Sequence, residues 1–134
     1  MQLRFVIIIF CCAILCYCNA KKYSKAENAL DAGREFIDGC LKGDFEKAAF
    51  YMLDDDRNKE LLLAQKRNYE GKNKQEKMEY NNASIIINED ATLNDSTHII
   101  NYQNSYDKIG RKIKVIFHNS TWLVDFKYTF NGNL

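Results

Sequence analysis

Apolar residues recur at helical spacing in the early part of the chain. One side of the segment 24–43 carries small or apolar residues at three- and four-residue intervals: Ala26, Ala29, Leu30, Gly33, Phe36, Ile37, Cys40 and Leu41. This spacing predicts one amphipathic helix with a buried face. Ser24, with Glu27 three residues on, is typical of a capping box at the helix start, and Gly43 is typical of a helix end.

Two further helices are predicted before the pattern changes. Asp44 is positioned to cap a short second helix. The third helix is predicted from about Arg57 to Tyr69, because acidic residues precede it and Gly71 follows it. The strongly polar segment 72–80 is expected to be a loop or one further helical turn.

The second half of the chain alternates between apolar and polar residues, which is the period of a strand. Four strands are predicted, over residues 83–88, 97–103, 111–118 and 121–128, with a turn-rich connection over 88–94. Consecutive strands joined by short turns pair antiparallel. The sequence therefore predicts an α+β domain in which N-terminal helices pack on a curved antiparallel sheet of about four strands.

The segment Met1–Ala20 has the pattern of an export signal. Its apolar run, 5–15, is too short to span a bilayer, which takes about 20 residues. One interpretation is cleavage after Ala20, because Cys18-Asn19-Ala20 places small residues before the cut. The other is lipidation, because Leu15-Cys16-Tyr17-Cys18 resembles a degenerate lipobox with Cys18 as the modified residue. The remainder, 21–134, is expected to form a single domain.

Cysteine usage and charge exclude several classes of protein. Four of the five cysteines lie in the leader, which leaves Cys40 and no disulfide framework. One of the 19 basic residues, Arg4, also lies there, so the body balances 18 basic against 18 acidic residues. A balanced chain without a basic stripe argues against nucleic acid as a partner. Membrane contact is expected only through a lipid anchor.

Four short motifs follow one another in an order that resembles a known family. They are residues 32–37 (AGREFI), 43–48 (GDFEKA), 54–56 (DDD) and 120–125 (STWLVD). With the leader in front, they resemble small uncharacterised lipoproteins of Bacteroidetes in the nuclear-transport-factor-like, or cystatin-like, superfamily. Asn119-Ser120 replaces the usual glycine-containing turn. The resemblance covers about Ala26–Tyr128 and implies a cone, with a long helix inside a bent sheet and often a pocket. It implies no reaction.

A pocket of such a cone is expected to be lined by aromatic and polar side chains. The candidates are Phe36, Tyr51, His98, Tyr102 and Trp122. The sequence contains two histidines and no Cys or His cluster, so neither a metal nor a cofactor is expected. Cys40 falls on the buried helix face and is expected to be an inert core thiol.

The leading hypothesis for function is non-catalytic. It describes an exported domain of the bacterial cell envelope, lipid-anchored or periplasmic, which binds a small apolar ligand or an envelope protein. The alternative is a small cone-fold isomerase or hydrolase in which His98 acts with Tyr102 or Asp125. A homodimer formed through the exposed sheet face is a third expectation.

Overall fold

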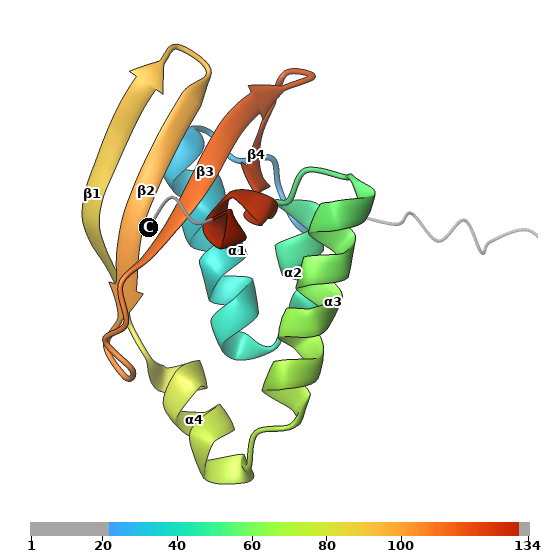
Figure 1. Ribbon diagram of the computed structural model, residues 1–134, viewed down its shortest axis with the longest axis vertical. Coiled ribbons are helices and arrows are strands. Elements are labelled where there is room, and N and C mark those ends of the chain that lie inside the picture. The colour runs from blue at the N-terminus through green and yellow to red at the C-terminus, as the bar shows by residue number, and fades with distance from the viewer. Residues whose placement is uncertain (1–21, 132–134) are drawn as a thin grey trace, which may run out of the picture.

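The computed structural model of the protein describes residues 22–131 (Figure 1). The predictions for Met1–Ala20, including lipidation at Cys18, lie outside these residues. The described chain forms four α-helices, then a four-stranded antiparallel sheet and a terminal 3₁₀ helix. The predicted α+β class, with helices packed on an antiparallel sheet, is confirmed.

The helices occupy the first half of the described chain. They are α1 (Ala29–Lys42), α2 (Phe45–Phe50), α3 (Asp56–Glu70) and α4 (Lys74–Asn82). Gly43 ends α1 in the left-handed conformation, with φ at 73°. Asp44 caps α2, because its side chain accepts a hydrogen bond from the amide of Lys47 at 3.1 Å. Both boundaries confirm the sequence-based predictions.

The start of α1 differs from the prediction. Asn28, not Ser24, is the N-cap, and its side chain accepts a hydrogen bond from the amide of Asp31 at 2.8 Å. The carbonyl of Ser24 instead accepts a hydrogen bond from the hydroxyl of Tyr51 at 2.7 Å. The local capping signal at Ser24 is therefore overridden by a contact with a residue far along the chain.

The polar segment after α3 forms a full helix, α4, and not a loop or a single turn. The Asn73 side chain accepts from the amide of Glu76 at 2.9 Å, and the Glu76 carboxylate accepts from the amide of Asn73 at 3.3 Å. This reciprocal capping box satisfies two amides at the helix start. None of the nine residues of α4 is buried, so apolar periodicity gave no sign of the helix.

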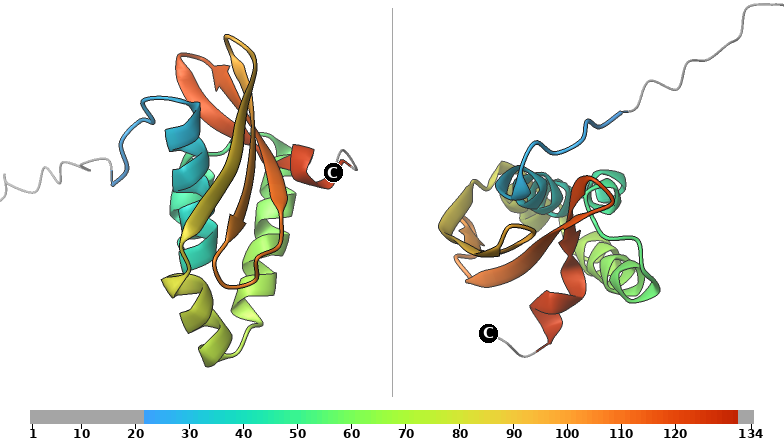
Figure 2. Two further views of the ribbon diagram at one scale, coloured as in Figure 1. Left: turned by 90° about the vertical axis from the view of Figure 1, so that its left-hand side faces the viewer. Right: turned by 90° about the horizontal axis from the view of Figure 1, so that it is seen from above.

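The sheet is a meander in which each strand pairs with the next. Its strands are β1 (Ile85–Asn94), β2 (Thr97–Asn104), β3 (Arg111–His118) and β4 (Thr121–Asp125). Ile100 lies opposite Ile113, and Val115 lies opposite Val124. All four side chains are completely buried and form the inner face of the sheet, along which α1 runs (Figure 2).

Two strands differ from their predicted ranges. β1 continues through 88–94, where a turn was expected, and two register shifts interrupt its alternation. β4 ends at Asp125 and is followed by the 3₁₀ helix η1 (Phe126–Phe130). The chain leaves the sheet there because the amide of Lys127 donates to Asn58 Oδ1 at 2.7 Å.

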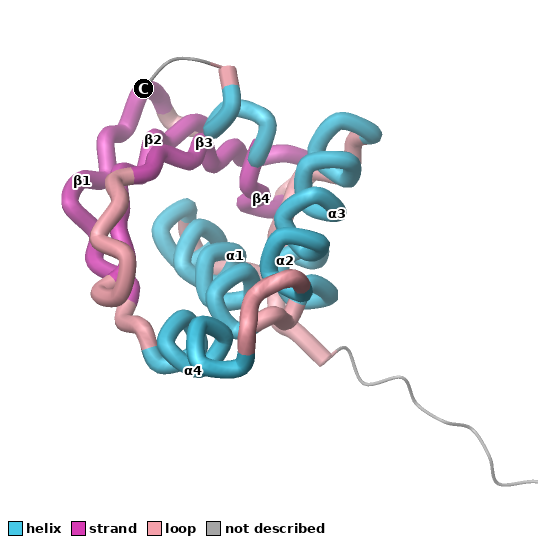
Figure 3. Tube along the Cα trace, turned by 60° about the horizontal axis from the view of Figure 1, so that its bottom comes forward, coloured by secondary structure: helices cyan, strands magenta, loops and turns pink. Residues whose placement is uncertain are grey.

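The core lies between α1 and the inner face of the sheet. Gly33 permits the close approach, since a Cβ at this position would lie 2.6 Å from Ile100 Cδ1. Phe36 and Ile37 are buried in the same contact. In Figure 3, α1 lies between the sheet and the other helices. The C-terminal half of α1 points toward α4 and the β2–β3 connection, and this end of the domain carries the cleft described below.

Candidate ligand-binding cleft

A cleft of about 260 Å³ opens at the end of the domain beside α4. The inner face of the sheet contributes Tyr102, Asn104 and Arg111, and α1 contributes Ile37, Cys40 and Leu41. The last turns of α3, the following loop and α4 contribute Gln65, Asn68, Tyr69, Lys72 and Tyr80. The cleft is therefore assembled from segments that are widely separated in the sequence.

Strand pairing brings the three side chains of the sheet together. Tyr102 and Asn104 are two residues apart on β2, so both point to the inner face. Arg111 opens β3 and lies directly opposite Tyr102 in the register. Side chains at directly opposed positions of an antiparallel pair have Cβ atoms about 5 Å apart. The phenol and the guanidinium are thus neighbours in one wall of the cleft.

The Tyr102 hydroxyl faces the cleft without a hydrogen-bond partner in the described chain. The side chain is 7% exposed, and the hydroxyl makes no hydrogen bond with any residue between 22 and 131. Buried tyrosine hydroxyls usually find a partner. No polar side-chain atom of the described chain is both sealed from solvent and unpaired, so solvent reaches this hydroxyl through the cleft. Burial raises its pKa, which keeps the group protonated and able to donate.

The orientation of the Asn104 amide is fixed by the turn that follows it. Asn104 is 2% exposed, and its Oδ1 accepts hydrogen bonds from the amides of Tyr106 and Asp107, each at 2.9 Å. Nδ2 must then point away from these two amides. The Asn104 side chain also helps to lower the pKa of the Asp107 carboxyl, so Nδ2 lies near that carboxylate. An amide nitrogen carries two hydrogens. At least one of them remains for a molecule in the cleft.

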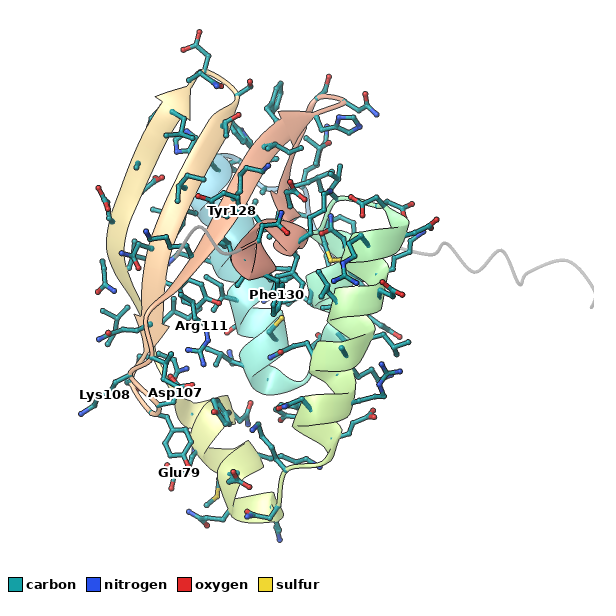
Figure 4. The ribbon with its side chains drawn as sticks, viewed as in Figure 1. Glu79, Asp107, Lys108, Arg111, Tyr128 and Phe130 are labelled. Carbon is teal, nitrogen blue, oxygen red and sulfur yellow. The ribbon has the colours of Figure 1, made fainter. Side chains whose placement is uncertain are left out.

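Asp107 holds Arg111 in place at the end of the sheet that lies toward α4 (Figure 4). The pair is bidentate, with Nη1 to Oδ1 at 3.1 Å and Nη2 to Oδ2 at 2.6 Å. Burial opposes ionisation of Asp107, but the hydrogen bonds and charge of Arg111, with hydrogen bonds from the Ile109 amide and Asn104, together outweigh it and lower the pKa of the carboxyl to about 2. Both groups are therefore charged at neutral pH, and Asp107 itself does not line the cleft.

Aromatic rings and one lysine form the outer rim. The ammonium of Lys72 lies 4.9 Å from the centroid of the Tyr80 ring. The Tyr80 hydroxyl donates to Asp107 Oδ2 at 3.3 Å, which ties α4 to the β2–β3 connection. Tyr69 supplies a second ring from α3. The rim therefore combines flat apolar surfaces with a positive charge.

Cys40 lies in the cleft as a protonated thiol. Burial raises its pKa to about 12, far above neutral pH. A thiolate, not a thiol, is the nucleophilic form of cysteine. Cys40 therefore contributes a soft apolar surface to the cleft and no reactive group.

A second hollow, of about 430 Å³, lies on the outer side of α1 and has a different character. Its charged groups are satisfied by one another. Lys47 pairs with Glu35 and Asp38, and the Tyr23 hydroxyl donates to Asp44 at 2.9 Å. These pairs hold the N-terminal segment and α2 against α1, so the cleft beside α4 is the stronger candidate.

Of the five predicted pocket residues, the structure places only Tyr102 in the cleft. Phe36 is 1% exposed and packs in the core against Phe126, with ring centroids 4.9 Å apart. Tyr51 is also buried, and its hydroxyl is occupied by the carbonyl of Ser24. Tyr51 lines the second hollow, on the outer side of α1, and neither residue lines the cleft beside α4. The close packing of α1 on the sheet fills the space around Phe36 that an open cone would leave.

His98 and Trp122 lie at the opposite end of the sheet from the cleft. His98 shares the inner face with Tyr102 but is four residues away on β2, roughly 13 Å along the strand. Its Nδ1 lies 2.8 Å from Asp90 Oδ1, and its ring packs edge-on against Trp122 at 5.4 Å. The structure therefore does not place His98 and Trp122 in the cleft.

The structure does not bring His98 together with Asp125. Alternation along β4 puts Asp125 on the face opposite Trp122, as the sequence suggested. There it is 5% exposed and pairs with Lys114 and Lys127, each at 2.8 Å. Asp125 is part of an ion-pair network that holds β4 and η1, and it has no access to the cleft.

Several cleft residues were absent from the sequence-based set. Asn104 continues the same alternation as Tyr102, so extending the strand by one residue would have found it. Arg111 was placed at the start of β3, but its role depends on pairing with Asp107, which no periodicity encodes. Lys72 and Tyr80 were missed because the segment 72–80 was expected to be a loop or one further helical turn.

Comparisons with known proteins add no assignment. No family model, no curated protein and no solved structure matches this chain. The resemblance to the Bacteroidetes lipoproteins therefore stays a prediction.

Among residues 22–131, no helix is both long and apolar enough to cross a membrane. The same residues contain no group of three or more His, Cys, Asp or Glu side chains positioned to hold a metal ion.

Proposed function

We propose that this protein is an exported small-molecule-binding domain with no reaction of its own, and that its ligand occupies the cleft beside α4. The observation that carries the proposal is the hydroxyl of the buried Tyr102 side chain, which faces the cleft without a partner in the described chain. A ligand that fills the cleft shields this hydroxyl from solvent, and leaving it without a partner there would cost about 1–3 kcal/mol. The cleft therefore selects a ligand that accepts its hydrogen bond.

The chemistry of the cleft favours binding over catalysis. Covalent catalysis needs a nucleophile within hydrogen-bonding reach of a base. The thiol of Cys40 is protonated at neutral pH, and no histidine lines the cleft. His98, on which an enzymatic role depends, contacts Asp90 and Trp122 at the other end of the sheet.

Export is proposed from the leader, and a cell-envelope location from its resemblance to lipoproteins. In one form, cleavage after Ala20 releases a free domain that begins at Lys21. In the other, Cys18 becomes the lipidated first residue and tethers the domain to a membrane surface. Both forms place the cleft outside the cytoplasm, where it meets small molecules of that compartment.

Mass spectrometry of the protein purified gently from its own host tests both parts of this proposal. The denatured mass is expected to correspond to a start at Lys21, or at Cys18 with acyl chains attached. A mass that still includes Met1–Ala20 contradicts export. The native mass is expected to exceed the denatured mass by the mass of a small molecule, and equal masses contradict ligand binding.

A pair of matched variants shows whether the bound molecule occupies the cleft. Tyr102→Phe removes only the unpaired hydroxyl and is expected to lower the fraction of protein that carries the extra mass. Tyr128→Phe is the control, because Tyr128 lies on η1, away from α4 (Figure 4). Equal loss in both variants would contradict the assignment of the ligand to the cleft.

A further inference from the structure

Building on the proposed function, we infer that the ligand is a small organic anion, a carboxylate or a comparable acid on a flat apolar body. Its acidic group is received by Tyr102, Asn104 and Arg111. Its apolar body lies between α1 and the rim tyrosines. This assigns the ligand a chemical class that neither the leader nor the fold implies, and it differs from the wholly apolar ligand expected from the sequence.

The charge of the cleft favours an anion. Arg111 and Lys72 line it, and no Asp or Glu does. Asp107 balances Arg111 from behind, which leaves Lys72 as an uncompensated positive charge among the lining residues. A cationic ligand would meet only like charge there, whereas an anion would gain from both groups.

The unused donors of the cleft also favour an acid group. A guanidinium has five N–H donors. Two of them bond to Asp107 and one to the carbonyl of Ile109, so two are without a hydrogen bond inside the described chain. The Tyr102 hydroxyl and one N–H of Asn104 add two more. A carboxylate accepts about four hydrogen bonds through its two oxygens, which matches this set.

The apolar part of the cleft sets the shape of the remainder of the ligand. Ile37 and Leu41 of α1 offer an aliphatic surface, and Tyr69 and Tyr80 offer ring faces or edges. A volume of about 260 Å³ is slightly below the usual range for drug-sized ligands, so the molecule is small. A pure hydrocarbon fits this space but leaves every donor of the wall unpaired, which is costly.

Titration of the ¹⁵N-labelled full chain with three probes of one shape tests the charge preference. The probes are 2-naphthoate, 2-naphthamide and 2-naphthylmethylammonium. Two-dimensional NMR spectra monitor each titration. The naphthoate is expected to shift the Asn104 side-chain resonances and to bind at least about tenfold more tightly than the amide. The ammonium is expected to bind more weakly than the amide.

Two variants test the named donors. Tyr102→Phe is expected to weaken naphthoate binding about tenfold while leaving the melting temperature nearly unchanged, because its hydroxyl has no partner in the described chain. Asn104→Asp keeps an oxygen for the amides of Tyr106 and Asp107 but adds a negative charge to the wall. It is expected to reverse the preference, so that the ammonium binds better than the naphthoate. Asn101→Asp, the same change on the other face of β2, is the control and is expected to keep the wild-type preference.

The outcomes separate this inference from the proposed function. Equal or tighter binding of the amide or the ammonium overturns the anion assignment and leaves a ligand-binding cleft standing. If none of the three probes shifts the cleft resonances, the assignment is also overturned, and the native mass of the host-purified protein then decides the broader proposal. If Asn104→Asp fails to fold, unchanged naphthoate affinity in Tyr102→Phe still rejects the inference.

Discussion

Replacing Asn58 with alanine is expected to destabilise the protein strongly, although Asn58 does not line the cleft. Asn58 lies in the first turn of α3 and is completely buried. Its Oδ1 accepts from the amide of Lys127 at 2.7 Å, and its Nδ2 donates to the carbonyl of Leu53 at 3.2 Å and to Asp55 at 3.0 Å. One side chain therefore ties the start of α3 to the residues that leave the sheet.

The expected loss follows from the groups that alanine would leave behind. The Lys127 amide would lose its side-chain partner in a partly buried setting, whereas the Leu53 carbonyl would keep the hydrogen bond from the Asp55 amide at 3.0 Å. The unpaired amide costs about 1–3 kcal/mol and the lost hydrogen bonds of Nδ2 add about 1 kcal/mol, so the free energy of unfolding is expected to fall by about 2–4 kcal/mol. For a domain of this length, that corresponds to a decrease in Tm of roughly 10–20 °C.

Urea denaturation of the full chain, followed by circular dichroism, measures this change. Asn68→Ala is the matched control, because Asn68 is an exposed asparagine on the same helix. Its stability is expected to stay within about 0.5 kcal/mol of the wild type. The reasoning is refuted if Asn58→Ala lowers the free energy of unfolding by less than about 1 kcal/mol, or by no more than the control does.

Helix packing, an ion pair and the exposed helix α4 give three more predictions. Gly39→Ala is expected to lower the free energy of unfolding by roughly 1–3 kcal/mol, because the added Cβ would lie 2.8 Å from the backbone of α2. Gly71→Ala is expected to be nearly neutral, because its nearest neighbour lies 3.5 Å away. Urea denaturation measures both changes. The pKa of Asp107 is lowered to about 2, so its ion pair stabilises the fold above the unfolded pKa and is lost as the pH falls toward 2. Between about pH 5 and pH 2, the free energy of unfolding is expected to fall by about 2 kcal/mol more in the wild type than in Asp107→Asn. Thermal melts that give parallel pH profiles for the two proteins would contradict this. Amides of α4, which has no buried residue, are expected to exchange hydrogen faster than those of α1, and equal protection would show that α4 is more firmly held.

Local signals predicted the fold where local chemistry decides the conformation. The αL glycine at Gly43 and the capping Asp44 are such cases, and the range of β3 agrees with its alternation. The prediction failed where residues that are distant in the sequence determine the local conformation. Ser24 has a capping pattern, but its carbonyl is bound by Tyr51. β4 stops early because the side chain of Asn58, from α3, accepts a hydrogen bond from the amide of Lys127.

The candidate site was harder to predict, because the sequence pattern does not distinguish an aromatic side chain in the core from one that lines a cleft. Phe36 and Tyr102 both sit on inner faces, and only packing against other elements separates the filled region from the open one. Strand alternation placed Tyr102 correctly. The pairing of His98 with Asp90, in contrast, depends on the register of β1, which two irregularities shift.

A crystal structure of the protein purified from its own host without denaturation tests the central claim most directly. The account predicts electron density for a small molecule in the cleft beside α4, with an acceptor atom within hydrogen-bonding distance of the Tyr102 hydroxyl. A cleft that holds only water, or is closed by a side chain that bonds to this hydroxyl, would contradict the claim that the protein is a ligand-binding domain.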